Sequence, residues 1–232
     1  MHRLRPPAPG RPRHSGLHLS EERYELPPER LGRWLDRWGE AHGGIAATAI
    51  DDARRVVTHT GHDGAVVTCE PPFPPLAPGD DLLAHVARER TVGVLLVRLG
   101  GHAAGVFAGR RLVASKTGAR LVHGRHRAGG SSSGRFARRR AGQARVALQA
   151  AAGVAVHVLR APAERGELEA VVLGGDRAAL TAVLEDPRLA AVRALAAERV
   201  LDVPDPRRAV LEASPDRFLA TIVRIPPPRS PI

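Results

Sequence analysis

The chain has 232 residues in ordinary globular proportions, 43% hydrophobic and 25% charged, which suffices for one domain with its own core. Its single cysteine, Cys69, excludes an intramolecular disulfide and a cysteine-based zinc site, and no run approaches the roughly 18 apolar residues that indicate a membrane span. The net charge of +11 points to a polyanionic partner, either nucleic acid or an anionic membrane surface.

The two ends of the chain differ in composition from its middle. Residues 1–22 are rich in proline, arginine and glycine, which predicts a disordered basic arm, and residues 226–232 predict a flexible tail. The arm has no apolar run of signal-peptide length, so we expect a cytoplasmic protein. Residues 23–225 are expected to fold as one domain.

The first part of this domain predicts a helix followed by three strands. Pro28 opens the helix, which carries apolar side chains on one face and ends at the Gly43-Gly44 pair. Three short β-type runs follow, and the turn residues between them predict an antiparallel meander. The runs are residues 45–50, 54–60 and 65–70.

The middle of the chain predicts a further helix, a second group of strands and a long helix. Asp80 is a suitable N-cap for a helix ending near Arg88. Residues 135–152 lack proline and carry small and apolar side chains on one stripe, with arginines largely off it, which predicts an amphipathic helix with a cationic outer face. The expected strands are 92–97, 103–107, 112–115 and 120–123.

The last third of the chain predicts alternating strands and helices. Strands are expected at 154–159, 168–173 and 219–225, and Asp176 is a suitable N-cap for a helix after the turn at Gly174-Gly175. Together the elements predict an α/β (α+β) fold, in which a mixed β-sheet is flanked by helices and a glycine-rich loop leads into a basic helix.

The excess positive charge is concentrated in one segment. From Arg90 through Ala163 the sequence has fourteen Arg and Lys residues and no Asp or Glu, whereas the remainder carries 21 basic and 24 acidic residues. Genome base composition would explain the preference for arginine, since Lys116 is the only lysine, but it would not explain the missing acids. The segregation favours a functional surface that faces a phosphate backbone.

A glycine-serine loop at residues 129–134 lies within this basic segment. Its glycines permit close backbone approach, and the helix behind it offers unpaired N–H groups to an anion. Eight arginines fall between Arg120 and Arg145, which favours a phosphate-facing site over an ordinary surface loop.

Two common motifs nearly match this loop. Gly129 and Gly134 have the spacing of a P-loop, but Arg135 follows where the motif needs lysine, which disfavours an NTPase. The loop also fits the nucleophile elbow of serine hydrolases, with Ser132 as nucleophile, but the acid and histidine that should follow are not in the required order. We therefore retain a serine hydrolase only as a third hypothesis, weaker than the two that are stated below.

The segment around the loop resembles a known family, the actinobacterial VLRF peptidyl-tRNA hydrolases. These are relatives of the eukaryotic Vms tRNA hydrolase and of eukaryotic and archaeal peptide release factors. The resemblance covers roughly residues 24–225. The stretches that carry it are VGVLLVR at 92–98, SK at 115–116, GR at 124–125, AGG at 128–130, RFARRR at 135–140, GGDR at 174–177 and DPR at 205–207.

The resemblance implies a release-factor-like catalytic domain that enters the peptidyl-transferase centre and frees nascent chains from tRNA on stalled large subunits. It also implies that the loop corresponds to the release factors' glycine-glycine-glutamine element, whose glutamine helps to place a water at the ester carbonyl. Here Ser133 stands where the family glutamine aligns. Gln143 cannot replace that glutamine, because ten helical residues at about 1.5 Å each place it about 15 Å away.

We therefore expect a ribosome-associated peptidyl-tRNA hydrolase with a degenerate catalytic loop or, alternatively, a non-catalytic RNA- or ribosome-binding rescue adaptor. The expected partners are the large ribosomal subunit and its tRNA or rRNA, with no membrane, metal or cofactor. The expected catalytic residues are Gly129, Gly130, Ser132, Ser133 and Gly134. The expected RNA-binding residues are Lys116, Arg120, Arg125, Arg127, Arg135, Arg138, Arg139, Arg140 and Arg145.

Overall fold

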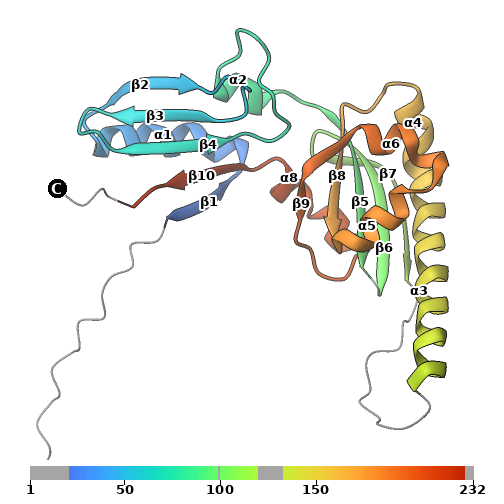
Figure 1. The fold of residues 1–232 in the computed structure, drawn as a ribbon. Coiled ribbons are helices and arrows are strands. Elements are labelled where there is room, and N and C mark those ends of the chain that lie inside the picture. Colours follow the sequence, from blue (N-terminus) through green and yellow to red (C-terminus); the bar gives the residue numbers. More distant parts are fainter. Residues whose placement is uncertain (1–20, 99, 120–132, 228–232) are drawn as a thin grey trace, which may run out of the picture.

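The computed structural model describes residues 21–98, 100–119 and 133–227, with the side chains of 133–140 left aside. This part of the chain forms two five-stranded sheets with helices packed against them (Figure 1). The strand order is β1-β10-β4-β3-β2 in the first sheet, called sheet A here, and β7-β6-β5-β8-β9 in the second, called sheet B. The expected α/β class with a mixed sheet is confirmed in sheet B.

Sheet A is antiparallel throughout and carries α1 (Pro28–Ala41) on one face. Leu31, Leu35 and Trp38 recur at helical spacing and are buried in the core beneath the helix, as the sequence predicts. The strands of the sheet are β1 (Glu22–Leu26), β2 (Ile45–Ile50), β3 (Val57–Gly61), β4 (Val66–Glu70) and β10 (Thr221–Ile225).

The expected meander is confirmed as β2, β3 and β4, but its second strand begins at Val57 rather than at residue 54. The Asp51 carboxylate accepts the N–H groups of Arg55 and Val56, both at 2.6 Å, and this holds the preceding residues in a turn. The helix that follows the meander is α2 (Leu82–Ala87), and its N-cap is Asp81 rather than the expected Asp80. The Asp81 side chain accepts the N–H of Ala84 at 2.7 Å.

Sheet A contains a strand from the far end of the chain. The strand expected near 219–225 is confirmed as β10, but it lies between β1 and β4 rather than in the central sheet. Its partner β1 was not expected, because Glu22 was assigned to the N-terminal arm. The rest of that arm, residues 1–20, lies outside the described residues.

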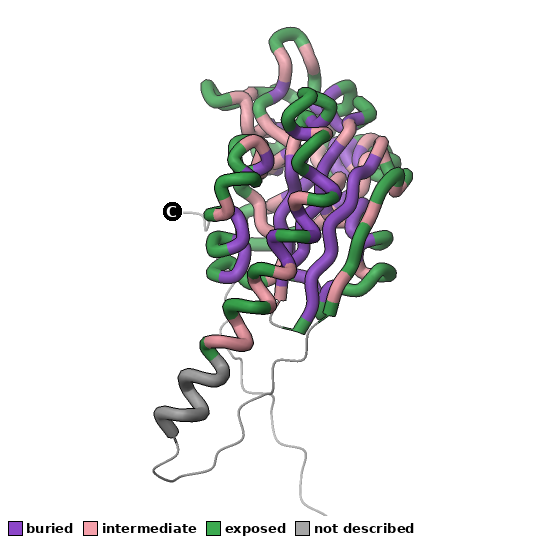
Figure 2. The backbone as a smooth tube through the Cα atoms, turned by 90° about the vertical axis from the view of Figure 1, so that its right-hand side faces the viewer, coloured by how far each residue is buried: buried purple, intermediate pink, exposed green. Residues whose placement is uncertain are grey.

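Sheet B combines antiparallel and parallel pairing around β5 (Thr91–Arg98). Leu95 and Val97 enter the core on one face, and Val94 and Leu96 enter the core on the other, so β5 is buried on both sides. Figure 2 shows these central strands as the buried part of the molecule. The other strands are β6 (Gly101–Ala108), β7 (Arg111–Ala119), β8 (Ala170–Gly175) and β9 (Ala196–Leu201).

One face of sheet B is covered by a long helix that differs from the expectation. α3 (Ser133–Ala155) continues through the π-helical turn η1 (Val156–Arg160) into α4 (Ala161–Glu164). The strand expected at 154–159 is therefore wrong. Val154, Val158 and Leu159 enter the core at helical spacing, and a short apolar run cannot by itself distinguish a strand from a buried helix segment.

This same helix corrects a second expectation, the absence of any membrane-length apolar segment. Residues Ala141–Glu164 are long and apolar enough to cross a membrane by length and composition alone, and 44% of the apolar window is buried inside the protein. A core helix of a soluble protein meets the same criterion. Ala151, Ala155 and Leu159 are part of the core beneath sheet B, so this part of the segment is buried by packing within the protein.

Shorter helices complete both faces of sheet B. Asp176 caps α5 as expected, since its carboxylate accepts the N–H of Ala179 at 2.9 Å. The helices on the α3 side are α5 (Arg177–Leu184), η2 (Pro187–Leu189) and α6 (Ala190–Ala194), and those on the opposite side are α7 (Arg208–Glu212) and α8 (Pro215–Phe218).

Candidate functional site

The carboxyl ends of the parallel strands β5, β8 and β9 meet at one edge of sheet B. Val97 pairs with Gly175 across β5 and β8, and Gly174 pairs with Leu201 across β8 and β9. β6 begins and β7 ends at this edge too, and α3 starts beyond it (Figure 1). Ligands of open α/β sheets bind outside the carboxyl ends of the strands, so this edge is the candidate site.

The expected catalytic loop connects two described anchors at this edge, the end of β7 at Ala119 and the start of α3 at Ser133. Gly129, Gly130 and Ser132 lie outside the described residues. Ser133 and Gly134 lie in the first turn of α3, and the side chain of Ser133 is not described. The roles of these five residues therefore stay predictions.

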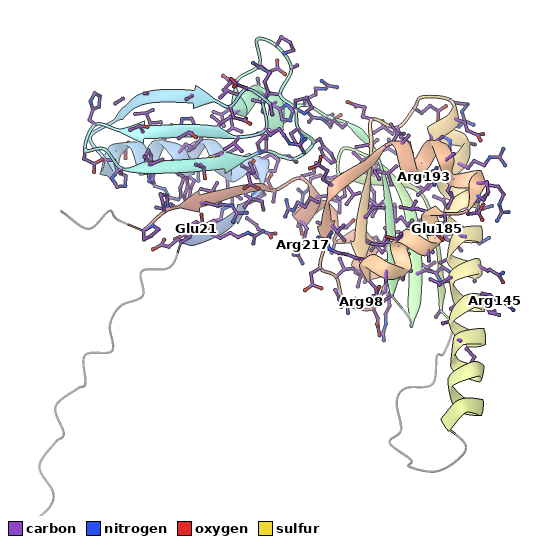
Figure 3. The ribbon with its side chains drawn as sticks, viewed as in Figure 1. Glu21, Arg98, Arg145, Glu185, Arg193 and Arg217 are labelled. Atoms are coloured by element: carbon purple, nitrogen blue, oxygen red, sulfur yellow. The ribbon has the colours of Figure 1, made fainter. Side chains whose placement is uncertain are left out.

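Two of the expected RNA-binding side chains are described, and both are exposed. Lys116 lies on β7 opposite Ala104, which belongs to the core on the α3 side, so the lysine emerges on the face that α3 covers. Arg145 lies on α3 (Figure 3). Residues Arg135, Arg138, Arg139 and Arg140 lie in the first turns of α3 without described side chains, and Arg120, Arg125 and Arg127 lie outside the described residues.

A tight turn after β8 brings a further arginine to this edge. Gly175 has a φ of +105°, and a Cβ at this position would lie 2.1 Å from the carbonyl oxygen of Val97. The same oxygen accepts the N–H of Asp176 at 2.8 Å, and Asp176 in turn caps α5. Only glycine fits this approach, which places the exposed Arg177 at the start of α5 next to the end of β5.

An ion pair ties the end of β5 to the segment after β9. Arg98 Nη2 donates to Asp202 Oδ1 at 2.8 Å, and Arg217 Nη1 donates to the Asp202 carbonyl at 2.7 Å. Figure 3 shows Arg98 at the lower end of sheet B and Arg217 near sheet A. The Arg98 Nε atom is buried and has no hydrogen-bond partner among the described residues.

The segment 205–207 packs on the turn between β5 and β6. A Cβ on Gly101 would lie 3.0 Å from the Pro206 carbonyl, and a Cβ on Gly100 would lie 3.7 Å from the Asp205 carboxylate. Arg207 follows as the exposed N-cap residue of α7 and makes no ion pair within the described part of the chain. Together, these contacts bring another free cation to the candidate site.

Arg98, Arg177 and Arg207 thus join Lys116 at one edge, although they come from separate segments. The sequence reading did not assign Arg177 and Arg207 to the RNA surface, because they lie outside the acid-free segment. Parallel pairing of β5 with β8 was the missing information, since it brings the ends of strands far apart in sequence to a common edge.

A buried histidine lies beneath the same edge. His102 is 4% exposed and aligns with Val97 on one side and Gly118 on the other. A Cβ on Gly118 would lie 2.3 Å from His102 Nε2, so the imidazole occupies the space above the end of β7. No local sequence pattern indicates this histidine, because its burial follows from the pairing of β6 with both β5 and β7.

The side chains at this edge favour phosphate binding over metal binding. Within the described residues, no group of three His, Cys, Asp or Glu side chains could hold a metal ion. Asp176 caps a helix and Asp202 lies in an ion pair, whereas Asp205 is exposed and forms no ion pair within the described residues. This one free carboxylate is outnumbered by three exposed cations, namely Lys116, Arg177 and Arg207. The edge is therefore suited to holding phosphates next to the loop.

Comparison with known proteins gives one family match. The family model described as Actinobacteria/chloroflexi VLRF1 release factor matches residues 90–224, which is more than half of the chain and includes all of sheet B. No curated protein matches.

Two solved structures show weak similarity. The archaeal translation termination factor aRF1 has 14% identity and a TM-score of 0.43, covering 87% of this chain and 67% of that one. A structure described as an archaeal protein has 14% identity and a TM-score of 0.40, covering 87% and 66%. The chain spans about two thirds of the length of both.

Proposed function

Because the chain belongs to the Actinobacteria/chloroflexi VLRF1 release factor family, we propose that it is a ribosome-associated peptidyl-tRNA hydrolase. Family membership supports a role in translation release or rescue at the ribosome. The finer proposal, which is ester hydrolysis on stalled large subunits, rests on one observation. The glycine-rich segment joins β7 to the arginine-rich start of α3 at the edge where the strands of sheet B present their carboxyl ends.

In the proposed reaction, water attacks the ester carbonyl that links the nascent peptide to tRNA, and the tRNA hydroxyl leaves. The backbone N–H groups of Gly129 and Gly130 stabilise the negative charge that develops on the carbonyl oxygen. The N-terminus of α3 adds its positive end to the same region. Ser133 replaces the positioned glutamine with a shorter hydroxyl, and loss of one such group commonly costs about a hundredfold in rate.

The cations at the edge hold the RNA in this proposal. Four exposed side chains take no part in the ion pairs of the described residues, namely Lys116, Arg145, Arg177 and Arg207. Such side chains position a phosphate backbone without reading its sequence. This suits a protein that acts on many different stalled complexes in the cytoplasm, which is where we propose that it works.

The deciding experiment is a single-turnover assay on purified large subunits that carry peptidyl-tRNA. We expect slow release by the wild type and release about a hundredfold faster after Ser133→Gln, because the substitution restores the positioned group. Ser133→Ala is the matched control and should not accelerate release. If neither the wild type nor Ser133→Gln releases the peptide, the hydrolase proposal is wrong.

The alternative function is a non-catalytic rescue adaptor, and the observation that favours it is Ser133 itself. An adaptor binds the same subunits, and the logarithm of its affinity falls linearly with the logarithm of salt concentration. Lys116→Ala should reduce that slope by about one, whereas Arg37→Ala, an exposed arginine on α1, should leave it unchanged. Peptide release by the unaltered protein would rule the adaptor out.

A further inference from the structure

A cavity of about 810 Å³ lies between sheets A and B, at the opposite edge of sheet B from the candidate site. It is bounded by the link 71–75 after β4, by the starts of β8 and β9, and by Phe218. Prolines, alanines, leucines and two phenylalanines make up about half of its lining, and charged residues make up much of the rest. Its volume is within the roughly 300–1,000 Å³ that small-molecule sites occupy, and junctions between units are a preferred location for them.

Two ion pairs connect the sheets across the rim of this cavity. Arg55 Nη2 lies 2.6 Å from Glu198 Oε2, and Arg88 pairs with Glu169. All four side chains are substantially exposed, with Glu198 at 79%. Charge at the rim is therefore both paired and screened by water.

The other acidic groups of the lining are engaged as well. Glu70 accepts from Arg224 Nε at 2.9 Å, and the exposed Asp51 accepts two backbone N–H groups. Arg199, also in the lining, has Glu25 as a carboxylate partner at 3.4 Å. Within the described part of the chain, Asp51 is thus the one carboxylate of the lining without a cation partner, and it is exposed rather than buried in the wall.

Arg90 differs from the other arginines of the lining. It is 6% exposed and forms no ion pair within the described residues, although the more distant carboxylates of Glu169 and Asp80 act on it electrostatically. Its Nη1 donates to the carbonyls of His85 at 3.0 Å and Arg88 at 3.1 Å, and its guanidinium lies 5.6 Å from the centre of the Phe73 ring. Burial lowers the pKa of Arg90, since the charged form is poorly solvated there.

The side chain next to Arg90 does not supply a direct counter-charge either. His85 is buried and its Nε2 lies 2.9 Å from the Pro72 carbonyl. Burial lowers the pKa of this imidazole, which favours its neutral form. The inner wall of the cavity therefore holds one positive charge among apolar and aromatic surfaces.

We propose that this cavity binds a small molecule with an aromatic body and a single anionic group, which faces Arg90 beside Phe73. The apolar walls take up the aromatic body, and the anion pairs with a buried guanidinium that forms no ion pair within the described residues. The site is independent of the proposed hydrolase function, because it lies at the other edge of sheet B.

The test uses the full-length protein and a pair of probes with one aromatic skeleton. Calorimetric titration with 8-anilinonaphthalene-1-sulfonate should show saturable one-site binding, and Arg90→Met should weaken it by at least about tenfold. The neutral N-phenyl-1-naphthylamine lacks the sulfonate, so Arg90→Met should leave its binding unchanged. Ala197→Trp, which fills the cavity from β9, should abolish binding of both probes.

Ala182→Trp is the matched control, because it places the same side chain on the exposed face of α5, outside the cavity lining. It should leave both affinities unchanged. Absence of saturable sulfonate binding at millimolar concentration would overturn the proposal. So would sulfonate binding that Ala197→Trp does not weaken, and this variant decides the matter even where Arg90→Met fails to fold.

Discussion

Substitution of Gly175 offers the most direct test of how the backbone at the candidate site is built. Alanine at this position would carry a Cβ 2.1 Å from the Val97 carbonyl oxygen, and the backbone there has a φ of +105°. The unfavourable φ costs about 1–3 kcal/mol. Moving the carbonyl away also weakens the bond that it accepts from Asp176 N at 2.8 Å, which adds about 0.5–1.5 kcal/mol.

We therefore expect Gly175→Ala to lower the free energy of unfolding by about 2–4 kcal/mol, measured by urea denaturation. For a chain of this size, the corresponding fall in Tm is roughly 4–16 °C. Gly153→Ala is the matched control, because Gly153 lies on α3 with nothing within 4 Å of its added Cβ. It should stabilise the helix by about 0.5–1 kcal/mol. Equal stability of the two variants would refute the reasoning.

Three further predictions concern a helix cap, buried histidines and the thiol. Asp176→Ala should cost about 0.5–2 kcal/mol of unfolding free energy, because the Ala179 N–H loses its acceptor, and Asp176→Asn should restore most of it in the same urea assay. Burial lowers the pKa of His59 and of His85, so the unfolded chain binds more protons below about pH 6.5. The stability that the neutral imidazoles contribute above that pH should be lost as the pH falls through their lower folded-state pKa values. Equal urea midpoints at pH 7.5 and about 5.5 would contradict this assignment. Burial raises the pKa of Cys69 to about 12 from an ordinary value near 9.0, so alkylation by iodoacetamide should be about a thousandfold slower in the native protein than in urea, and similar rates would show that the thiol is accessible.

The elements predicted correctly from the sequence are those with strong local signals. α1 has an opening proline, an apolar stripe and a glycine pair at its end, and Asp176 follows a glycine turn at the start of α5. The strands β5 and β6 are long apolar runs separated by glycine. In each case neighbouring residues alone specify the structure, which is why a sequence pattern suffices.

The errors arise where distant parts of the chain decide the structure. β1 is an outermost strand of sheet A, and β9 is an outermost strand of sheet B. Both carry charged residues such as Glu22 and Glu198, so their apolar pattern is weak. The segment 154–159 became a helix because α3 continues across the sheet. The candidate site shows the same division. The loop and Lys116 were proposed from local sequence alone, and their roles stay predictions, whereas placing Arg177 and Arg207 depended on strand pairing.

The position of β10 has a consequence for how this protein is made. Glu22 pairs with Ile225, and Val223 pairs with Cys69, so sheet A joins residues from the two ends of the described chain. During synthesis the other four strands of this sheet, within residues 22–70, emerge well before β10 at residues 221–225 has been translated. Contacts of such long sequence separation slow folding. A protein proposed to rescue stalled ribosomes is thus itself exposed to stalling, because a nascent chain arrested before β10 cannot close its first sheet.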